Sequence, residues 1–275
     1  MTLPSLSLEG RIALVTGGKR GIGKAIALVL AEAGADVAIA DYIIDDGELK
    51  AVAEEIGGLG RRCLAVQSDV SQKSEVEELV KRVESELGVI DILVNNAGIS
   101  GLEIRSEIPD EHWQKVIDVN LNGCYLCSQE VSQRMVERKK GNIINIASVE
   151  GLRGGVLPKA LAPMIPVPTV PTGPTLVGQP YNVSKAGIIM LTRVMARQLG
   201  SYGIRVNAIA PGGIRTEMIR FIWDNADFMK QLETQVPLGR IGETSEIASV
   251  ALFLASDASS YVTGHTLVAD GGLLA

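Results

Sequence analysis

Seven short runs of apolar residues recur along the chain, and each has the length of a β-strand. The runs are apolar throughout instead of alternating with polar residues, which is typical of strands covered on both faces in a parallel sheet. They lie at residues 12–15, 37–40, 64–66, 90–94, 143–146, 204–209 and 266–269.

Helical patterns separate these strands. Apolar residues recur at intervals of three and four over residues 22–33 and 76–87, and each pattern ends at a glycine, Gly34 or Gly88. The alternation predicts one α/β domain over residues 1–275, with a Rossmann-like, doubly wound, seven-stranded parallel sheet flanked by helices on both faces. In such folds, ligands bind beyond the carboxyl ends of the strands.

One connection, at about residues 155–180, interrupts this alternation of strands and helices. It has no helical or strand period, and residues 160–184 contain no charged side chain. A segment so rich in proline cannot join a helix or a sheet ladder, so we expect it to be extended and stiff. Seven of the eleven prolines lie here, at Pro158, Pro163, Pro166, Pro168, Pro171, Pro174 and Pro180.

Composition and charge narrow the class of protein. With 46% apolar residues the chain can bury a core, and its formal net charge of -6 offers no broad basic surface for nucleic acid or an anionic membrane. No run approaches the roughly 18 apolar residues of a membrane span, and the first ten residues do not have the pattern of a signal peptide. Three cysteines do not make a disulfide framework. We therefore expect a cytoplasmic protein with no nucleic-acid or membrane partner.

A glycine cluster follows the first strand. The chain reads Thr16-Gly17-Gly18-Lys19-Arg20-Gly21-Ile22-Gly23 and then enters a helix, so the free N–H groups of that helix can bind a pyrophosphate. Asp41 ends the second strand, 18 residues after Gly23, where a carboxylate can accept hydrogen bonds from an adenosine ribose. The alternatives are an ordinary strand-to-helix turn and a helix-capping acid. The two features together favour a dinucleotide site.

Tyr181 and Lys185 stand one helical turn apart, so both side chains project from one face. Hydride transfer at a carbinol carbon needs a group that moves the hydroxyl proton, and a nearby ammonium favours the phenolate form of a tyrosine. The alternative is a buried tyrosine beside an unrelated surface lysine. Of the five tyrosines, only Tyr181 has a lysine four residues later.

The glycine spacing T-G-x-x-x-G-I-G resembles that of the short-chain dehydrogenase/reductase family. The resemblance continues through Asn95-Asn96-Ala97-Gly98 after the fourth strand and through residues 211–216 after the sixth. It implies that Asp69 and Val70 contact the adenine side and that residues 211–216 hold the nicotinamide carboxamide. The cofactor-binding residues that it implies are Gly17, Arg20, Gly21, Ile22, Gly23, Asp41, Asp69, Val70, Asn96, Ala97, Gly98, Tyr181, Lys185, Pro211, Gly212, Ile214 and Thr216.

The resemblance also implies two further catalytic residues besides Tyr181 and Lys185. Ser148, which closes the fifth strand, is similar to the family serine that hydrogen-bonds the substrate oxygen. Asn120 matches the asparagine that holds a water between the lysine and bulk solvent. Family members are most often tetramers packed through the long helices around Asn120 and Tyr181, so we expect a homotetramer.

Two residues point in opposite directions on the choice of cofactor. In the family, an acid at the position of Asp41 usually indicates NAD, because a carboxylate repels a 2'-phosphate. A base at the position of Arg20 is frequent in members that bind NADP. Two anions in contact in a partly desolvated pocket cost more than an unused arginine gains, so NAD is favoured over NADP.

The chain departs from the family pattern between Ser148 and Tyr181, which are 33 positions apart where the family usually has about a dozen residues. The proline-rich segment is therefore an insertion of roughly 20 residues, which loop-closure entropy tolerates. Our hypothesis is an apolar wall or lid over the substrate, or a contact with a neighbouring subunit; the alternative is a solvent-exposed decoration.

These patterns predict an NAD-dependent oxidoreductase that transfers a hydride between the nicotinamide and a secondary alcohol or ketone. The alternatives are an NADPH-dependent 3-oxoacyl-thioester or other carbonyl reductase, and a dinucleotide-binding sensor without turnover. Substrate choice depends on the insertion and on a substrate-loop region at about residues 216–237. Glu150 is either a substrate contact or a plain loop acid. Cys124 and Cys127 are read as small buried helix residues, and we expect no metal.

Overall fold

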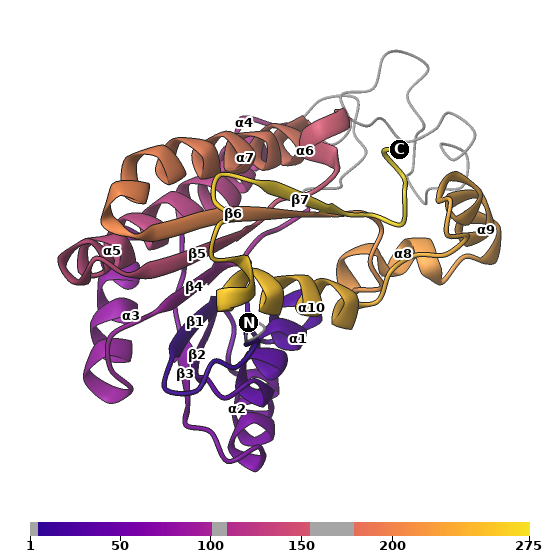
Figure 1. Cartoon of the computed structure of the whole chain (residues 1–275). Helices are drawn as coiled ribbons and strands as arrows, with labels where there is room; N and C mark the ends of the chain where they lie inside the picture. The colour runs from indigo at the N-terminus through magenta and orange to yellow at the C-terminus, as the bar shows by residue number, and fades with distance from the viewer. Residues whose placement is uncertain (1–4, 101–108, 155–178) are drawn as a thin grey trace.

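The computed structural model describes residues 5–100, 109–154 and 179–275, and within them one seven-stranded sheet carries the fold (Figure 1). Its strand order is β3-β2-β1-β4-β5-β6-β7, and every neighbouring pair is parallel. The strands are β1 (Ile12–Thr16), β2 (Asp36–Asp41), β3 (Cys63–Gln67), β4 (Ile92–Asn95), β5 (Gly141–Ile146), β6 (Ile204–Pro211) and β7 (Thr266–Ala269). The predicted sheet is confirmed, because each apolar run forms a strand.

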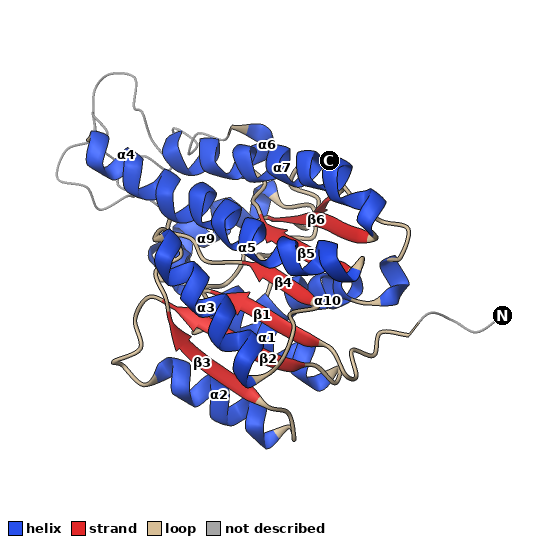
Figure 2. Cartoon of the chain, turned by 90° about the vertical axis from the view of Figure 1, so that its left-hand side faces the viewer, coloured by secondary structure: helices blue, strands red, loops and turns tan. Residues whose placement is uncertain are grey.

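Helices connect the strands and cover both faces of the sheet (Figure 2). The helices are α1 (Gly21–Glu32), α2 (Glu48–Gly58), α3 (Lys73–Glu86), α4 (Asp110–Ile117), α5 (Gly123–Arg138), α6 (Glu150–Arg153), α7 (Gln179–Leu199), α8 (Arg220–Trp223), α9 (Ala226–Gln235) and α10 (Thr244–Ala255). A π-helical turn, η1 (Asp118–Asn122), joins α4 to α5, and 3-10 turns occur at η3 (Gly200–Tyr202), η4 (Glu217–Ile219) and η5 (Asp257–Ser259). Gly34 and Gly88 follow α1 and α3 with positive φ, as predicted.

The two faces of the sheet are buried in separate hydrophobic clusters. On one face, Ala13 and Val15 of β1 pack with residues of α1, α2 and α10. On the other face, Leu14 of β1 packs with residues of α3, α5 and α7. Alternate residues of one strand therefore enter opposite layers, which is why the strands are apolar throughout. Among the described helices, none is long and apolar enough to cross a membrane.

The strand order places a crevice at the carboxyl ends of β1 and β4. The chain runs outward from β1 through β2 to β3 and then returns to β4 on the other side of β1. The helices that follow β1 and β4 therefore leave in opposite directions and do not fill the space above these strand ends. Thr16 and Asn95, the last residues of β1 and β4, lie at the base of this crevice.

Candidate active site

The glycine cluster lets β1, α1 and the end of β4 approach one another closely. A Cβ atom at Gly23 would collide with the carbonyl oxygen of Gly17 and with Nδ2 of Asn96. Gly17 and Gly21 have φ values of 64° and 57°, which favour glycine. Within the described residues, no side chain caps the N-terminus of α1, and its first turn holds no acid. The helix N-terminus therefore presents N–H groups to the crevice, which fits a pyrophosphate.

Thr16 organises the segment after β4. Its Oγ1 accepts hydrogen bonds from the backbone N–H groups of Asn96 and Ala97, both at 3.1 Å, and donates to the carbonyl oxygen of Val94 at 3.4 Å. Asn96 Nδ2 donates to the carbonyl oxygens of Thr16 (3.0 Å) and Gly17 (2.9 Å). Thr16 is the first residue of the glycine motif, but its role in holding the segment after β4 was not predicted; its place at the end of a buried strand was the available signal.

Asp41 lies at the carboxyl end of β2, beside the glycine loop. Its Oδ2 accepts a hydrogen bond from the backbone N–H of Lys19 at 3.3 Å, and its Oδ1 accepts one from Tyr42 N–H at 2.9 Å. These bonds fix the carboxylate while each oxygen keeps a lone pair. The arrangement fits the acceptor of two ribose hydroxyls.

Asp69 and Val70, the expected adenine-side residues, are held by local contacts. Asp69 Oδ1 accepts hydrogen bonds from Ser71 N–H (2.9 Å) and Ser71 Oγ (2.7 Å). The Val70 side chain is buried and packs against Gly123 at the start of α5, where a Cβ would lie 2.7 Å from Val70 Cγ2. The backbone of Val70 and Oδ2 of Asp69 are therefore the groups that can make the predicted contact with the adenine side of the cofactor.

The end of β6 and the loop after it connect the segment after β5 with the glycine loop. The carbonyl oxygen of Pro211 accepts a hydrogen bond from Val149 N–H at 3.0 Å, and Gly212 N–H donates to Ala269. Ile214 is buried, and Thr216 Oγ1 donates to its carbonyl oxygen at 3.2 Å. A Cβ at Gly21 would lie 3.5 Å from Thr216 Cγ2. Residues 211–216 therefore reach the N-terminus of α1, as their predicted role requires.

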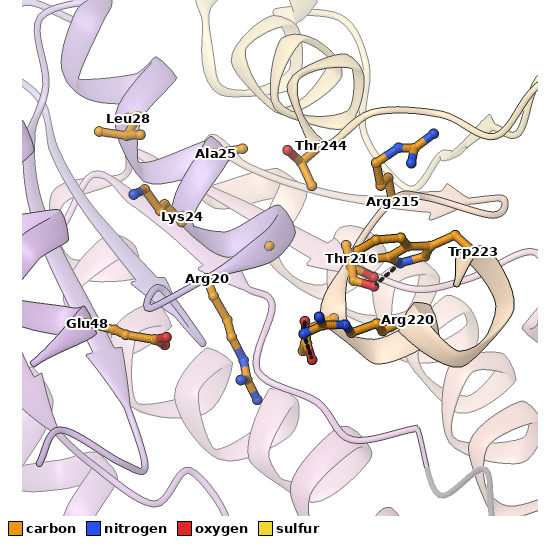
Figure 3. Close-up of a pocket in the computed structure, with 12 residues that line it drawn as sticks. Arg20, Lys24, Ala25, Leu28, Glu48, Arg215, Thr216, Arg220, Trp223 and Thr244 are labelled. Atoms are coloured by element: carbon orange, nitrogen blue, oxygen red, sulfur yellow. Dashed lines mark hydrogen bonds and ion pairs between the residues drawn. The ribbon is translucent and has the colours of Figure 1, made fainter. Parts of the chain in front are cut away.

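Trp223 of α8 holds the start of the substrate-loop region against residues 215–216. Its Nε1 donates a hydrogen bond to the carbonyl oxygen of Thr216 at 3.0 Å, and its ring lies 5.8 Å from the guanidinium carbons of both Arg215 and Arg220 (Figure 3). Beside it, a pocket of about 640 Å³ separates α1 from α8. Helices α8 and α9 lie within the expected substrate-loop region at about residues 216–237.

Three side chains of the predicted catalytic set meet where β5 and α7 adjoin. The Ser148 side chain lies beside the Tyr181 phenol, close enough to lower the pKa of that phenol. Lys185 Nζ lies 5.6 Å from the centroid of the Tyr181 ring and donates a hydrogen bond to the carbonyl oxygen of Ile146 at 2.8 Å. The bond to Ile146 ties α7 to the end of β5. The helical spacing and the tertiary contacts thus bring Ser148, Tyr181 and Lys185 together.

The pKa shifts differ from the simple expectation for a tyrosine beside an ammonium. Burial raises the pKa of Tyr181; the hydrogen bond from Ser148 opposes this rise, and the charge of Glu150 adds to it. Burial lowers the pKa of Lys185 to about 8. The Lys185 ammonium lies 5.6 Å from the centroid of the ring but bonds the Ile146 carbonyl, and it does not outweigh the desolvation of the phenol. The protein alone therefore holds Tyr181 as a neutral phenol.

Asn120 is fully buried in the π-helical turn η1. Its Oδ1 accepts a hydrogen bond from Ile99 N–H at 2.8 Å, and its Nδ2 donates to the Ile99 carbonyl oxygen (3.0 Å) and to Ser184 Oγ (3.1 Å). A Cβ at Gly98 would lie 3.2 Å from Asn120 Oδ1 and 3.6 Å from Lys185 Nζ. The segment after β4, Asn120 and Lys185 therefore converge on one point.

Helix α6 holds Ser148 against α7. A Cβ at Gly151 would lie 2.6 Å from the carbonyl carbon of Lys185 and 2.7 Å from the nitrogen of Ala186. Glu150 pairs with Arg153 at 2.6 Å, and its backbone N–H donates to Ser148 Oγ at 3.1 Å. Glu150 stands out in the sequence, whereas Gly151 does not, because its importance depends on a helix more than thirty residues away.

Cys124 and Cys127 lie buried on α5, and burial raises the pKa of Cys124 to about 12. Cys124 Sγ lies 3.5 Å from Asn145 Oδ1 in a buried polar cluster with Asn95 and Ser128. This agrees with their interpretation as small buried helix residues. The proline-rich insertion falls almost wholly on residues 155–178, outside the described part of the chain. The hypothesis that it forms a wall or lid over the substrate, or contacts a neighbouring subunit, therefore stays a prediction.

Comparisons with known proteins agree with this arrangement. A sequence profile described as short chain dehydrogenase matches residues 11–159, and one described as Enoyl-(Acyl carrier protein) reductase matches residues 174–274. The chain is 40% identical over 262 residues to the 3-oxoacyl-[acyl-carrier-protein] reductase FabG of Staphylococcus epidermidis, covering 95% of this chain and 98% of that protein.

Solved structures agree as well. A short-chain type dehydrogenase/reductase from Mycobacterium marinum is 39% identical, with a TM-score of 0.84 over 98% of this chain and 97% of that chain. A gluconate 5-dehydrogenase from Burkholderia cenocepacia, in complex with NADP and tartrate, is 35% identical, with a TM-score of 0.85 over 98% and 97%. The profile match, the identity along nearly the whole chain and the common fold lead to one conclusion: the chain belongs to the short-chain dehydrogenase family of oxidoreductases.

Proposed function

We propose that this oxidoreductase transfers a hydride reversibly between NAD and a secondary alcohol or ketone. The observation that carries the proposal is the meeting of Ser148, Tyr181 and the buried Lys185, whose Nζ lies 5.6 Å from the centroid of the Tyr181 ring. A hydroxyl donor, a proton-transferring phenol and a buried cation lie together at the carboxyl ends of the strands. These are the groups that proton transfer to or from an alcohol oxygen requires.

The crevice supplies the contacts that a dinucleotide needs. The N-terminus of α1 would hold the pyrophosphate, and Asp41 would hold the adenosine ribose. The backbone of residues 96–98 would contact the part of the cofactor that lies between the pyrophosphate and Lys185. Residues 211–216 would hold the carboxamide of the nicotinamide. When bound, the cofactor accepts a hydride in its oxidised form and delivers one in its reduced form.

The side chains divide the proton transfer among them. Ser148 Oγ donates a hydrogen bond to the substrate oxygen and steadies the negative charge that develops there. Tyr181 takes the hydroxyl proton in oxidation and returns it in reduction. A buried phenol with a raised pKa keeps its proton at neutral pH, and positive charge nearby is needed both to release that proton and to let Tyr181 act as a base. Lys185 supplies that charge, and Asn120 aligns the path by which protons reach solvent.

Asp41 supports NAD as the cofactor. Its carboxylate is fixed by two backbone N–H groups at the end of β2, so it cannot turn away from a 2'-phosphate without losing both bonds. Two anions in contact in a partly desolvated pocket repel each other strongly. The NADP bound in the related Burkholderia structure favours the other cofactor.

A second candidate is an NADPH-dependent reductase of 3-oxoacyl thioesters. It is favoured by the 40% identity to 3-oxoacyl-[acyl-carrier-protein] reductase, which extends over 95% of this chain. The two candidates use the same catalytic side chains but different cofactors and substrates of very different length. Activity with each cofactor and each substrate class separates them.

We also propose a homotetramer built through α5 and α7. Val183, Met190 and Val194 are between 43% and 55% exposed and recur at helical spacing along one face of α7, with Tyr125 of α5 exposed as well. Such apolar side chains in a row favour burial against another subunit. Light scattering on purified protein tests this assembly directly.

The test of the activity combines a substrate panel with one variant. Polyols, sugars, hydroxy acids, cyclic alcohols and a 3-oxoacyl thioester are offered with NAD(H) and NADP(H), and nicotinamide fluorescence is followed. Tyr181→Phe keeps the ring but loses the exchangeable proton, so we expect cofactor binding within about twofold of wild type and a rate lowered by at least about 10³-fold. A variant that retains more than a few per cent of the rate contradicts the mechanism.

A further inference from the structure

An ion pair between the buried Lys19 and the exposed Asp46 lies next to Asp41, and none of the roles above uses it. Lys19, within the glycine loop, is only 5% exposed, and its Nζ lies 2.6 Å from Asp46 Oδ2 and 3.9 Å from Glu48 Oε2. The backbone N–H of the same residue donates to Asp41 Oδ2 at 3.3 Å. The pair therefore sits at the ribose end of the crevice.

We infer that Asp46 controls the choice between NAD and NADP by holding the Lys19 ammonium away from the position of a 2'-phosphate. The inference rests on the proposed function, because it concerns the same adenosine-ribose site. It assigns to Lys19 and Asp46 a role in selectivity in addition to that of Asp41.

The charges at this end of the crevice carry the argument. An ammonium is a good partner for a phosphate, and Lys19 belongs to the loop that contacts Asp41. At 2.6 Å from one carboxylate and 3.9 Å from another, its charge is already neutralised. The three acids Asp41, Asp46 and Glu48 still outnumber the two bases of the loop, Lys19 and Arg20, so a doubly charged 2'-phosphate meets net negative charge. An uncharged ribose hydroxyl carries no such cost.

Asp46 can release Lys19 without unfolding the segment that holds it. Asp46 is exposed and lies just before α2, whereas the lysine is buried. Asp46 Oδ1 accepts a hydrogen bond from Glu48 N–H at 3.1 Å. In Asp46→Asn, the amide oxygen can keep this bond, while the charge that restrains Lys19 is removed. The substitution thus isolates the ion pair from the start of the helix.

A purely structural role makes a different prediction. If the pair only ties residues 42–47 to the glycine loop, its loss loosens both adenine nucleotides equally. If it controls selectivity, only the nucleotide with a 2'-phosphate gains affinity. The ratio of two dissociation constants therefore distinguishes the roles, and it does so without any measurement of turnover.

The experiment uses two fragments of the cofactors as probes. Adenosine 2',5'-bisphosphate and adenosine 5'-monophosphate are titrated calorimetrically into wild type, Asp46→Asn and Asp45→Asn. Asp45 is the neighbouring exposed acid, so its variant controls for the loss of one negative charge from the loop. We expect Asp46→Asn to tighten the bisphosphate by about fivefold or more, with less than a twofold change for the monophosphate. Asp45→Asn should change the ratio by less than about twofold.

The double variant Lys19→Met/Asp46→Asn completes the design. It should lose the gain, because the released ammonium is the group that binds the extra phosphate. An unchanged ratio in Asp46→Asn, an equal change in Asp45→Asn, or a gain that persists without Lys19 each overturns the inference. The wild-type ratio tests the NAD preference separately: a wild type that favours the bisphosphate contradicts that preference, while the shift caused by Asp46→Asn still tests the ion pair.

Discussion

The side chain of Asn120 forms two hydrogen bonds with the backbone of Ile99, accepting from its N–H at 2.8 Å and donating to its carbonyl oxygen at 3.0 Å. The amide thus pairs with one residue as a neighbouring strand would, and its remaining N–H bonds Ser184 of α7. The π-helical turn directs this side chain inward. Three segments that carry candidate site residues are therefore joined through one buried amide.

Asn120→Asp should break this junction. The carboxylate loses the donor to the Ile99 carbonyl and to Ser184, and it places a charge in a fully buried position. We expect a loss of unfolding free energy of about 2–4 kcal/mol and a fall in kcat, measured by urea unfolding and steady-state kinetics. Asn122→Asp is the matched control, since Asn122 is exposed in the same turn, where solvent screens the new charge beside Asp118. Equal effects of both variants would contradict the role of the buried amide.

Lys185 should make stability depend on pH in a definite window. Its pKa is about 8 in the folded protein against an ordinary value of 10.5, so between these values the unfolded chain binds more protons. The free energy of unfolding of wild type, relative to Lys185→Met, should therefore rise with pH from 8 to 10.5, by about 3 kcal/mol in all. Below pH 8 both states hold the proton and the difference levels off. Urea unfolding of the two proteins across this range checks the slope; a constant difference would rule out a depressed pKa.

Gly151→Ala should disturb the active site through main-chain atoms. The added methyl group would lie 2.6 Å from the carbonyl carbon of Lys185, and the backbone of α7 cannot move aside as a flexible side chain would. We expect α6 to shift and carry Ser148 away from Tyr181, with kcat reduced at least about tenfold and stability lowered by about 1–3 kcal/mol. Gly57→Ala in α2 is the control, because no atom lies within 4 Å of its added Cβ and alanine favours a helix. A normal kcat in Gly151→Ala would show that the close packing does not position Ser148.

Asp41→Ser should loosen NADH and relax the preference towards NADPH. The substitution removes the charge that opposes a 2'-phosphate and shortens the acceptor for the ribose hydroxyls. We expect the dissociation constant of NADH to rise about tenfold while that of NADPH falls, both measured by the fluorescence of the bound reduced nicotinamide. Unchanged affinities for both cofactors would contradict the assignment of Asp41 to the ribose.

Much of this protein follows from local patterns. Apolar runs of strand length, helices closed by Gly34 and Gly88, and glycines at 17, 21 and 23 predict a parallel sheet with a nucleotide loop. Each of these signals is complete within a few residues, because strand burial, helix termination and tight turns depend on nearby side chains and backbone angles. The four-residue spacing of Tyr181 and Lys185 is of the same kind, since one turn of helix places them on one face.

The remaining features depend on contacts between segments that are distant in sequence. Thr16 acts on residues 94–97, Asn120 on Ile99 and Ser184, and Gly151 on the backbone of Lys185. The direction of the Tyr181 pKa shift is decided in the same way: the sequence places an ammonium one turn away, but the fold buries the phenol and turns that ammonium towards Ile146. The sequence therefore determined which chemical groups are present and how they are spaced. Tertiary burial and hydrogen bonding decided how each group is oriented and charged.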